Sequence, residues 1–249
     1  MVVSPRLLLL CVAAVAIACT APGCRAPGNP EAGGPPVPFK ARGNEPGWLL
    51  TITDDRMRLE YAYGTKQAHA PRPDPVGTPD GYRYVAAAGE HELHVRIRNR
   101  LCTDSMSGMY YPAAVTVRVD GETLSGCGGD PADLLTGGTW VVEDLAGRGV
   151  IDASRMTLRF RPDGRLGGRA SCNRYTASYV LTGELDIDAV TSTDESCAPA
   201  LMNQEQLFLR LLRNVRRFAI TDTGALRLVT TDGQAITARR RASLSTPET

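Results

Sequence analysis

Cysteines are the residues of this chain whose chemistry is easiest to infer. Seven occur in 249 residues, and a cysteine can be acylated, bind a metal, act as a nucleophile or form a disulfide. Cys19 directly follows an apolar run, 7–18, which itself follows the basic residue Arg6. Such a leader is typical of an export signal, and its apolar run is too short to span a bilayer. We therefore predict a signal peptide over 1–18 and lipidation of Cys19.

The cleavage site agrees with this prediction. Residues 16–19 read Ala-Ile-Ala-Cys, close to the bacterial lipoprotein pattern in which a Leu stands where this chain has Ala16. Cys24 is a rival acceptor beyond the apolar run, and cleavage near Ala21 would give an ordinary secreted protein instead. Thr20, rather than Asp, follows the acceptor, which favours the outer membrane, facing the periplasm. Several acyl chains would make such an anchor stable.

Charge and composition limit the partners. Removing the leader deletes only Arg6 from the 28 basic residues, which leaves 27 against 27 acidic ones. This balance does not favour nucleic acid as a partner. Residues 19–38 are rich in Pro, Gly and Ala and predict an extended tether, whereas 241–249 predict a disordered tail. The expected partners are the membrane, through the lipid, and an envelope protein or small ligand whose identity the sequence does not give.

Four cysteines remain in the body of the chain, and export to an oxidising compartment favours disulfides between them. They are Cys102, Cys127, Cys172 and Cys197. Pairing neighbours would join Cys102 to Cys127 and Cys172 to Cys197, with one bridge in each half of the chain. Four cysteines allow three connectivities, so this pairing is a hypothesis. Zinc is the rival use of these thiols, but the sequence has no Cys-x-x-Cys.

Other motifs invite a catalytic or metal interpretation, but each has a structural alternative. The spacing of His91 and His94 would place them on opposite faces of a strand, which does not suit a shared metal. The serines of 104–108 lack the Gly-x-Ser-x-Gly pattern of a hydrolase nucleophile. Acidic residues alternate along 184–188 and so share a face, as solvent-facing strand residues also do. The sequence therefore predicts no catalytic residue, cofactor or metal site.

Two aromatic and polar groups could serve a ligand or the core. Asn44, Glu45 and Trp48 lie together at the start of the body of the chain, where a Trp could form a ligand platform. A core position is commoner for such a residue, and we expect it for both Trp48 and Trp140. Asn173 is expected to bond neighbouring backbone at a turn beside a disulfide.

Alternating apolar and polar residues predict mainly β structure with one packed helix, in two small antiparallel-sheet domains over 39–133 and 134–240. The Gly-rich stretch 130–138 marks the joint, and 70–81, with four prolines, is expected to be a loop. A helix is expected over 199–215, where apolar residues recur every three or four positions. Strands are predicted at 48–53, 57–63, 82–88, 92–98, 114–119, 122–127, 139–144, 156–160, 166–171, 177–182, 184–187, 217–221, 226–230 and 235–239.

The second half resembles the META/HslJ domain family over about 134–240. The likeness is carried by the order and spacing of Thr139-Trp140, 160–164, the run 171–175 (Ser-Cys-Asn-Arg-Tyr), 193–197 and the predicted helix over 205–212. Ser171 stands where the family often has Gly. The resemblance implies a compact antiparallel sheet crossed by a helix, with a role in envelope stress, drug tolerance or secretion and no catalytic residue.

The first half is similar to a less described bacterial lipoprotein domain with which no activity is associated. Its likeness is carried by 43–48 (Gly-Asn-Glu-Pro-Gly-Trp), 102–108, Tyr111-Pro112 and 126–128. Together these features predict a non-enzymatic, lipid-anchored binding or stress-protection module of the cell envelope. An inhibitor of an attacking hydrolase, such as lysozyme or a protease, and a carrier of a small hydrophobic ligand near 207–215 are the alternatives.

Overall fold

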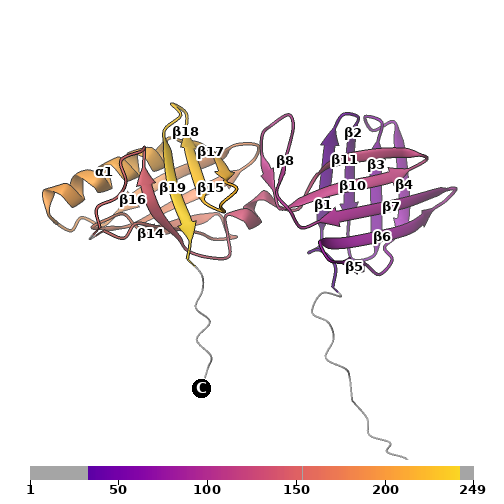
Figure 1. The fold of residues 1–249 in the computed structure, drawn as a ribbon, viewed down its shortest axis with the longest axis horizontal. Coiled ribbons are helices and arrows are strands. Elements are labelled where there is room, and N and C mark those ends of the chain that lie inside the picture. Colours follow the sequence, from indigo (N-terminus) through magenta and orange to yellow (C-terminus); the bar gives the residue numbers. More distant parts are fainter. Residues whose placement is uncertain (1–32, 153, 242–249) are drawn as a thin grey trace, which may run out of the picture.

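The computed structural model describes residues 33–152 and 154–241. In this part of the chain, most strands form two large antiparallel sheets, and one α-helix lies against the second sheet (Figure 1). The predicted fold class, mainly β with one packed helix, is confirmed. No helix in these residues is long and apolar enough to cross a membrane. The predicted signal peptide, Cys19, Cys24 and the tail from 242 onward lie outside the described residues.

The first sheet has nine strands in the order β4-β3-β2-β1-β11-β10-β7-β6-β5, and β4 also contacts β6. The sheet therefore curls round and encloses its own core. Its strands are β1 (Phe39–Asn44), β2 (Gly47–Ile52), β3 (Arg56–Tyr61), β4 (Lys66–Pro71), β5 (Val76–Thr78), β6 (Gly81–Ala88), β7 (His91–Arg98), β10 (Ala113–Val119) and β11 (Glu122–Gly128).

Alternation of side chains explains how this sheet separates its two faces. In β7, Leu93, Val95 and Ile97 are buried, whereas Arg96 between them is exposed. Successive side chains of a strand point to opposite faces, so the apolar set fills the inside of the curl and the basic set covers the outside. The strands predicted at 92–98 and 114–119 are confirmed.

Two sequence predictions in this half need correction. The stretch 70–81 is not wholly a loop, because β4 ends at Pro71 and β5 pairs with β6. Proline is tolerated there because β4 and β5 are the outermost strands of the hydrogen-bonded order. The predicted tether also ends earlier than Pro38, since Pro35 is buried and Val37 packs against the core of the first sheet.

The second sheet has eight strands in the order β16-β15-β14-β13-β12-β19-β18-β17, and its edge strands β16 and β17 contact each other. It too is strongly curled, and the predicted strands of this half agree with it to within a few residues. Its strands are β12 (Trp140–Leu145), β13 (Thr157–Phe160), β14 (Arg165–Arg169), β15 (Arg174–Leu181), β16 (Leu185–Ser192), β17 (Val215–Ile220), β18 (Leu226–Thr230) and β19 (Ala235–Arg240).

The helix α1 (Pro199–Arg213) packs its apolar side against this sheet. Pro199 suits the first turn of a helix, where its missing N–H is not needed. Phe208, Leu211 and Leu212 are buried, as the apolar spacing predicts. The helix ends two residues before the predicted 215, because the following residues pair with β18 as strand β17.

A short hairpin between β7 and β10 of the first sheet packs against the core of the second sheet. Its strands, β8 (Cys102–Thr103) and β9 (Tyr110–Tyr111), pair with each other and stand between the sheets in Figure 1. Met109 and Tyr111 are buried in the same apolar cluster as the residues of the second sheet. The 3₁₀ helix η1 (Pro131–Leu134) follows, so the predicted joint at 130–138 is an ordered segment that packs against β9.

Candidate functional site

Both disulfides have the pairing favoured by the sequence. Cys102 is bonded to Cys127 and Cys172 to Cys197, each across 25 residues. Each bridge lies beside a carboxylate that is buried among hydrogen-bond donors, Asp104 in the first half and Glu205 in the second. These two clusters hold most of the buried polar side chains of the described residues, so they are the candidate sites.

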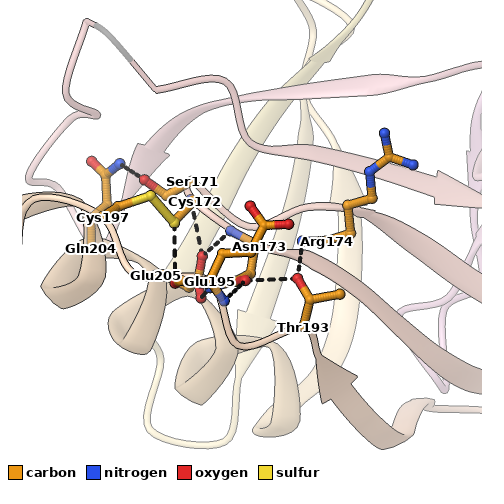
Figure 2. Close-up of a disulfide and its surroundings, with 9 residues drawn as sticks. All are labelled: Ser171, Cys172, Asn173, Arg174, Thr193, Glu195, Cys197, Gln204 and Glu205. Atoms are coloured by element: carbon orange, nitrogen blue, oxygen red, sulfur yellow. Dashed lines mark hydrogen bonds between the residues drawn. A yellow bond between two sulfur atoms is a disulfide. The ribbon is translucent and has the colours of Figure 1, made fainter.

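Glu205 is the centre of the second cluster (Figure 2). It lies on the sheet-facing side of α1 and is 4% exposed. Its Oε2 accepts hydrogen bonds from the backbone N–H groups of Cys172, at 3.0 Å, and Asn173, at 2.7 Å. Its Oε1 accepts from Asn173 Nδ2 at 2.8 Å. Both carboxylate oxygens are therefore used to hold the segment that carries Cys172, and the sequence did not single this residue out.

Asn173 links this carboxylate to the segment before the helix. Its Oδ1 accepts from Thr193 Oγ1 at 2.7 Å and from the backbone N–H of Glu195 at 2.8 Å, and its Nδ2 also donates to the Glu195 carbonyl at 3.2 Å. These contacts fix the orientation of the amide. Asn173 thus bonds backbone beside a disulfide, but the backbone is that of Glu195, 22 residues along the chain, and Glu205 is an additional partner.

Ser171 has an unusual backbone conformation next to the disulfide. Its φ of +90° lies in a region that a residue with a Cβ rarely adopts and glycine adopts freely. Its Oγ accepts a hydrogen bond from Gln204 Nε2 at 3.1 Å. This chain therefore has a serine at a position where the backbone conformation favours the glycine that the META/HslJ family often has.

Replacing Ser171 tests this strain. Ser171→Gly and Ser171→Ala both remove the contact with Gln204, but only glycine removes the Cβ that disfavours the positive φ. We expect the glycine variant to be more stable than the alanine variant by about 1–2 kcal/mol in free energy of unfolding, measured by denaturant titration. An alanine variant as stable as the glycine variant would show that the backbone is not strained at this position.

The first cluster is built around Asp104, which is 7% exposed. Its Oδ1 accepts from the backbone N–H groups of Met106, at 3.1 Å, and Ser107, at 2.7 Å, and from Ser107 Oγ at 2.7 Å. Its Oδ2 accepts from Asn44 Nδ2 at 2.9 Å. Burial raises the pKa of Asp104, but the hydrogen bonds from Ser107, Asn44 and Met106 outweigh it and lower the pKa below its ordinary value of 3.8.

This lowered pKa predicts a pH dependence of stability. A carboxylate whose folded pKa is depressed stabilises the protein above its unfolded pKa, and this contribution is lost as the pH falls through the folded pKa. We expect Asp104→Asn to lower the melting temperature at neutral pH, and the difference from the natural chain to shrink as the pH falls below 3.8. The exposed Asp54→Asn is the matched control. A difference that is independent of pH would contradict the assignment.

The other motifs are separated from one another. His91 Nδ1 lies 2.6 Å from Asp120 Oδ1 and His94 Nε2 lies 3.0 Å from Glu92 Oε2, so the two histidines have different partners. In the described part of the chain, no group of three or more His, Cys, Asp or Glu side chains is arranged to hold a metal ion. The acidic face predicted over 184–188 is present, and Asp186 pairs there with Arg216 at 3.2 Å.

Ser105 and Ser107 belong to the Asp104 loop. Ser105 Oγ accepts from Asn44 Nδ2 at 3.1 Å, and Ser107 Oγ donates to Asp104. Neither hydroxyl is hydrogen-bonded to a histidine among the described residues, so the loop lacks the nucleophile and base geometry of a serine hydrolase. The loop is instead held in shape by its own hydrogen bonds and by Cys102.

Both tryptophans occupy core positions, as expected. Trp48 is 5% exposed and its Nε1 donates to the Ser125 carbonyl at 3.2 Å. Its ring lies against Gly43 and Gly126, where a Cβ would meet the indole at 2.2 and 2.8 Å. Trp140 is 2% exposed, and its Nε1 donates to the Leu135 carbonyl at 2.8 Å. The ligand-platform alternative for Trp48 therefore has no exposed indole face to use.

A cavity of about 380 Å³ lies beside α1. Leu207 lines it, together with Arg148, Gln204 and Arg210. Phe208, Leu211 and Leu212 are instead buried in the core beneath the helix and fill the space between α1 and the sheet. The lining of this cavity is thus of mixed polarity, which does not suit a purely hydrophobic ligand.

The family match lies in the second half of the chain. The family model described as META domain matches residues 133–243. An NMR structure of a protein from Burkholderia xenovorans is 26% identical, with a TM-score of 0.39, and the match covers 45% of this chain and 89% of that one. A second NMR structure is 23% identical, with a TM-score of 0.37, covering 43% and 92%. No curated protein matches the chain.

Proposed function

We propose, starting from the match of residues 133–243 to the META domain family model, that the protein is a non-enzymatic, lipid-anchored module of the bacterial cell envelope that binds a partner or protects against stress. The observation that carries the proposal is the state of its buried polar groups. Glu205 has both carboxylate oxygens bonded to donors of the Cys172–Asn173 segment, and Asp104 has both bonded to donors of its own loop and of Asn44. These acids act as structural anchors, not as acids or bases facing a substrate.

The two disulfides support the envelope location. Disulfides form and persist in oxidising compartments such as the bacterial periplasm. The leader with Cys19 supplies both export and the lipid anchor, because each buried methylene of an acyl chain contributes about 0.8 kcal/mol to membrane binding. The N-terminal likeness to a lipoprotein domain remains a prediction.

Complementation of a deletion strain tests this proposal. We expect loss of the gene to increase sensitivity to detergent and to antibiotics that cross the envelope. The natural chain and Cys24→Ala should restore resistance, whereas Cys19→Ala should not and should leave the mature protein without attached acyl chains by mass spectrometry. Unchanged sensitivity after deletion would contradict the stress role, and acylation of the Cys19→Ala protein would contradict the anchor.

Inhibition of an attacking hydrolase is a second candidate, favoured by the hairpin between β8 and β9. Met106 at its tip is 80% exposed, while hydrogen bonds to Asp104 and the Cys102–Cys127 bridge hold the loop in shape. A preorganised loop loses little entropy when it binds, as a tight inhibitor requires. The natural chain should slow lysozyme or a protease at about micromolar concentration, and Met106→Asp should weaken that inhibition. No inhibition of either enzyme class would exclude this candidate.

A further inference from the structure

The outer face of the first sheet contains a cavity lined by three arginines. Its volume is about 350 Å³, and Arg42, Arg98 and Arg100 line it together with the hydroxyl residues Thr116 and Ser125. It lies outside the META domain, so the role inferred from that family does not account for it.

Strand register explains why the arginines converge. One row of paired residues crosses four neighbouring strands. It runs from Arg42 of β1 through Cys127 of β11 and Ala114 of β10 to Arg98 of β7. Two arginines therefore stand at the ends of one row across four strands, about 14 Å apart at their Cα atoms if each strand spacing is about 4.8 Å. The Arg42 guanidinium lies over the Tyr111 ring, with its Cζ 5.7 Å from the ring centroid. Between the two arginines, Ala114 is small, whereas Cys127 is bonded to Cys102, which also lines the cavity.

The acids near this cavity leave much of its positive charge available. Asp104 lines it, and its two oxygens accept hydrogen bonds from Ser107 and Asn44 instead of from an arginine. Glu45 also lines it and is exposed. Asp80 lies 3.7 Å from Arg98 Nε and 3.2 Å from Arg96, so one carboxylate is shared between two guanidinium groups. Neither Arg42 nor Arg100 is part of an ion pair within the residues described.

The surrounding face is also basic. Arg83 of β6 is directly opposite Arg96 of β7, and Arg118 of β10 lies on the same face. Like charges directly opposite each other destabilise a sheet, so the Arg83–Arg96 pair does not strengthen the fold. These arginines do raise the positive potential around the cavity, which would attract an anion.

We propose that this cavity binds a phosphate group, carried by a small phosphate ester or by a phospholipid headgroup. Guanidinium groups present paired N–H donors that match the oxygens of a phosphate, and hydrogen bonds between two charged groups are stronger than neutral ones. Arginines that line one cavity can contact different oxygens of one tetrahedral group. Thr116 and Ser125 add neutral hydroxyl donors. The proposal is independent of the stress role, because the residues that line the cavity lie outside the META match.

Titration of the full-length chain with inorganic phosphate and glycerol phosphate, followed by calorimetry, tests the proposal. We expect saturable binding that Arg100→Gln weakens about tenfold or more, the effect of removing one charged hydrogen-bonding group. Arg118→Gln is the matched control, since Arg118 is exposed on the same strand as Thr116 but does not line the cavity. Its affinity should stay within about twofold of the natural chain. Melting temperatures of both variants establish that they are folded.

Vesicles distinguish the source of the phosphate. Binding to phosphatidylglycerol vesicles that is lost in Arg100→Gln and competed by glycerol phosphate would indicate a lipid headgroup. Binding of the soluble esters without vesicle binding would indicate a free metabolite. Absence of binding to phosphate, ester and vesicle would overturn the proposal. Equal losses in Arg100→Gln and Arg118→Gln would also overturn it, because they would indicate diffuse surface charge instead of a site.

Discussion

Truncating Glu205 to alanine should destabilise the second half of this protein more than any other single change in its polar core. The substitution leaves the backbone N–H groups of Cys172 and Asn173 without their acceptor, inside a region from which water is excluded. It also removes one of the two acceptors of Asn173 Nδ2. Each buried donor left without a partner costs about 1–3 kcal/mol, so we expect a loss of at least about 3 kcal/mol in free energy of unfolding.

Glu205→Gln sharpens this expectation. Both carboxylate oxygens face N–H donors, so an amide nitrogen at either position would oppose a donor. Asn173 cannot turn its amide to compensate, because Thr193 and Glu195 already use its oxygen. Gln206→Ala, one residue further along α1 and exposed, should change stability by less than about 0.5 kcal/mol. Denaturant titration measures all three variants, and a Glu205→Gln variant as stable as the natural chain would show that the carboxylate is not required.

The sequence contained a signal for Glu205 that is clear only with hindsight. The apolar positions Leu201, Phe208 and Leu212 recur at helical spacing, and Glu205 falls on the same stripe, four residues after the first of them. A charged residue on the buried side of a helix needs partners from elsewhere in the fold. Those partners are backbone groups near Cys172, and no pattern of residue types marks a backbone N–H.

The strands were predictable where apolar residues alternate strongly, and less so where the buried residues are small. Val115, Val117 and Val119 identified β10. In β4 the buried residues are Ala68 and Ala70, which carry little hydrophobic signal. Pairing with β3 gives this segment its strand conformation. The strand conformation of β4 therefore comes from its tertiary context, because its own residue types have only a weak preference for a strand.

The arginine cavity could not be predicted from sequence for a similar reason. Arg42 and Arg98 are far apart in the chain, and only the order β1-β11-β10-β7 places them on one row. The strands β7, β10 and β11 were predicted, but β1, which carries Arg42, was not, and neither was the neighbour that each strand takes. A site built by strand order is thus invisible until the order is known.

Removing either disulfide should lower the free energy of unfolding by nearly the same amount. Each bridge spans 25 residues, so its removal gives the unfolded chain a similar gain in entropy. The chain-entropy relation gives about 3.5 kcal/mol for a loop of this length. We expect the double variant Cys102→Ser with Cys127→Ser to lose about this amount. The double variant Cys172→Ser with Cys197→Ser should lose about the same amount. Any difference in free energy of unfolding between the two double variants then reports on the native state.

That native-state difference has an expected sign. Glu205 and Asn173 hold the Cys172 segment through hydrogen bonds that do not involve sulfur, so this loop should keep its structure without the bridge. Loss of the Cys172–Cys197 bridge, with the other bridge intact, should then lower the free energy of unfolding by no more than the chain-entropy value. Combining it with Glu205→Ala should cost more than the sum of the separate effects, by about 0.5 kcal/mol or more, because both restrain one segment. Strict additivity in denaturant titration would show that the carboxylate and the bridge act independently.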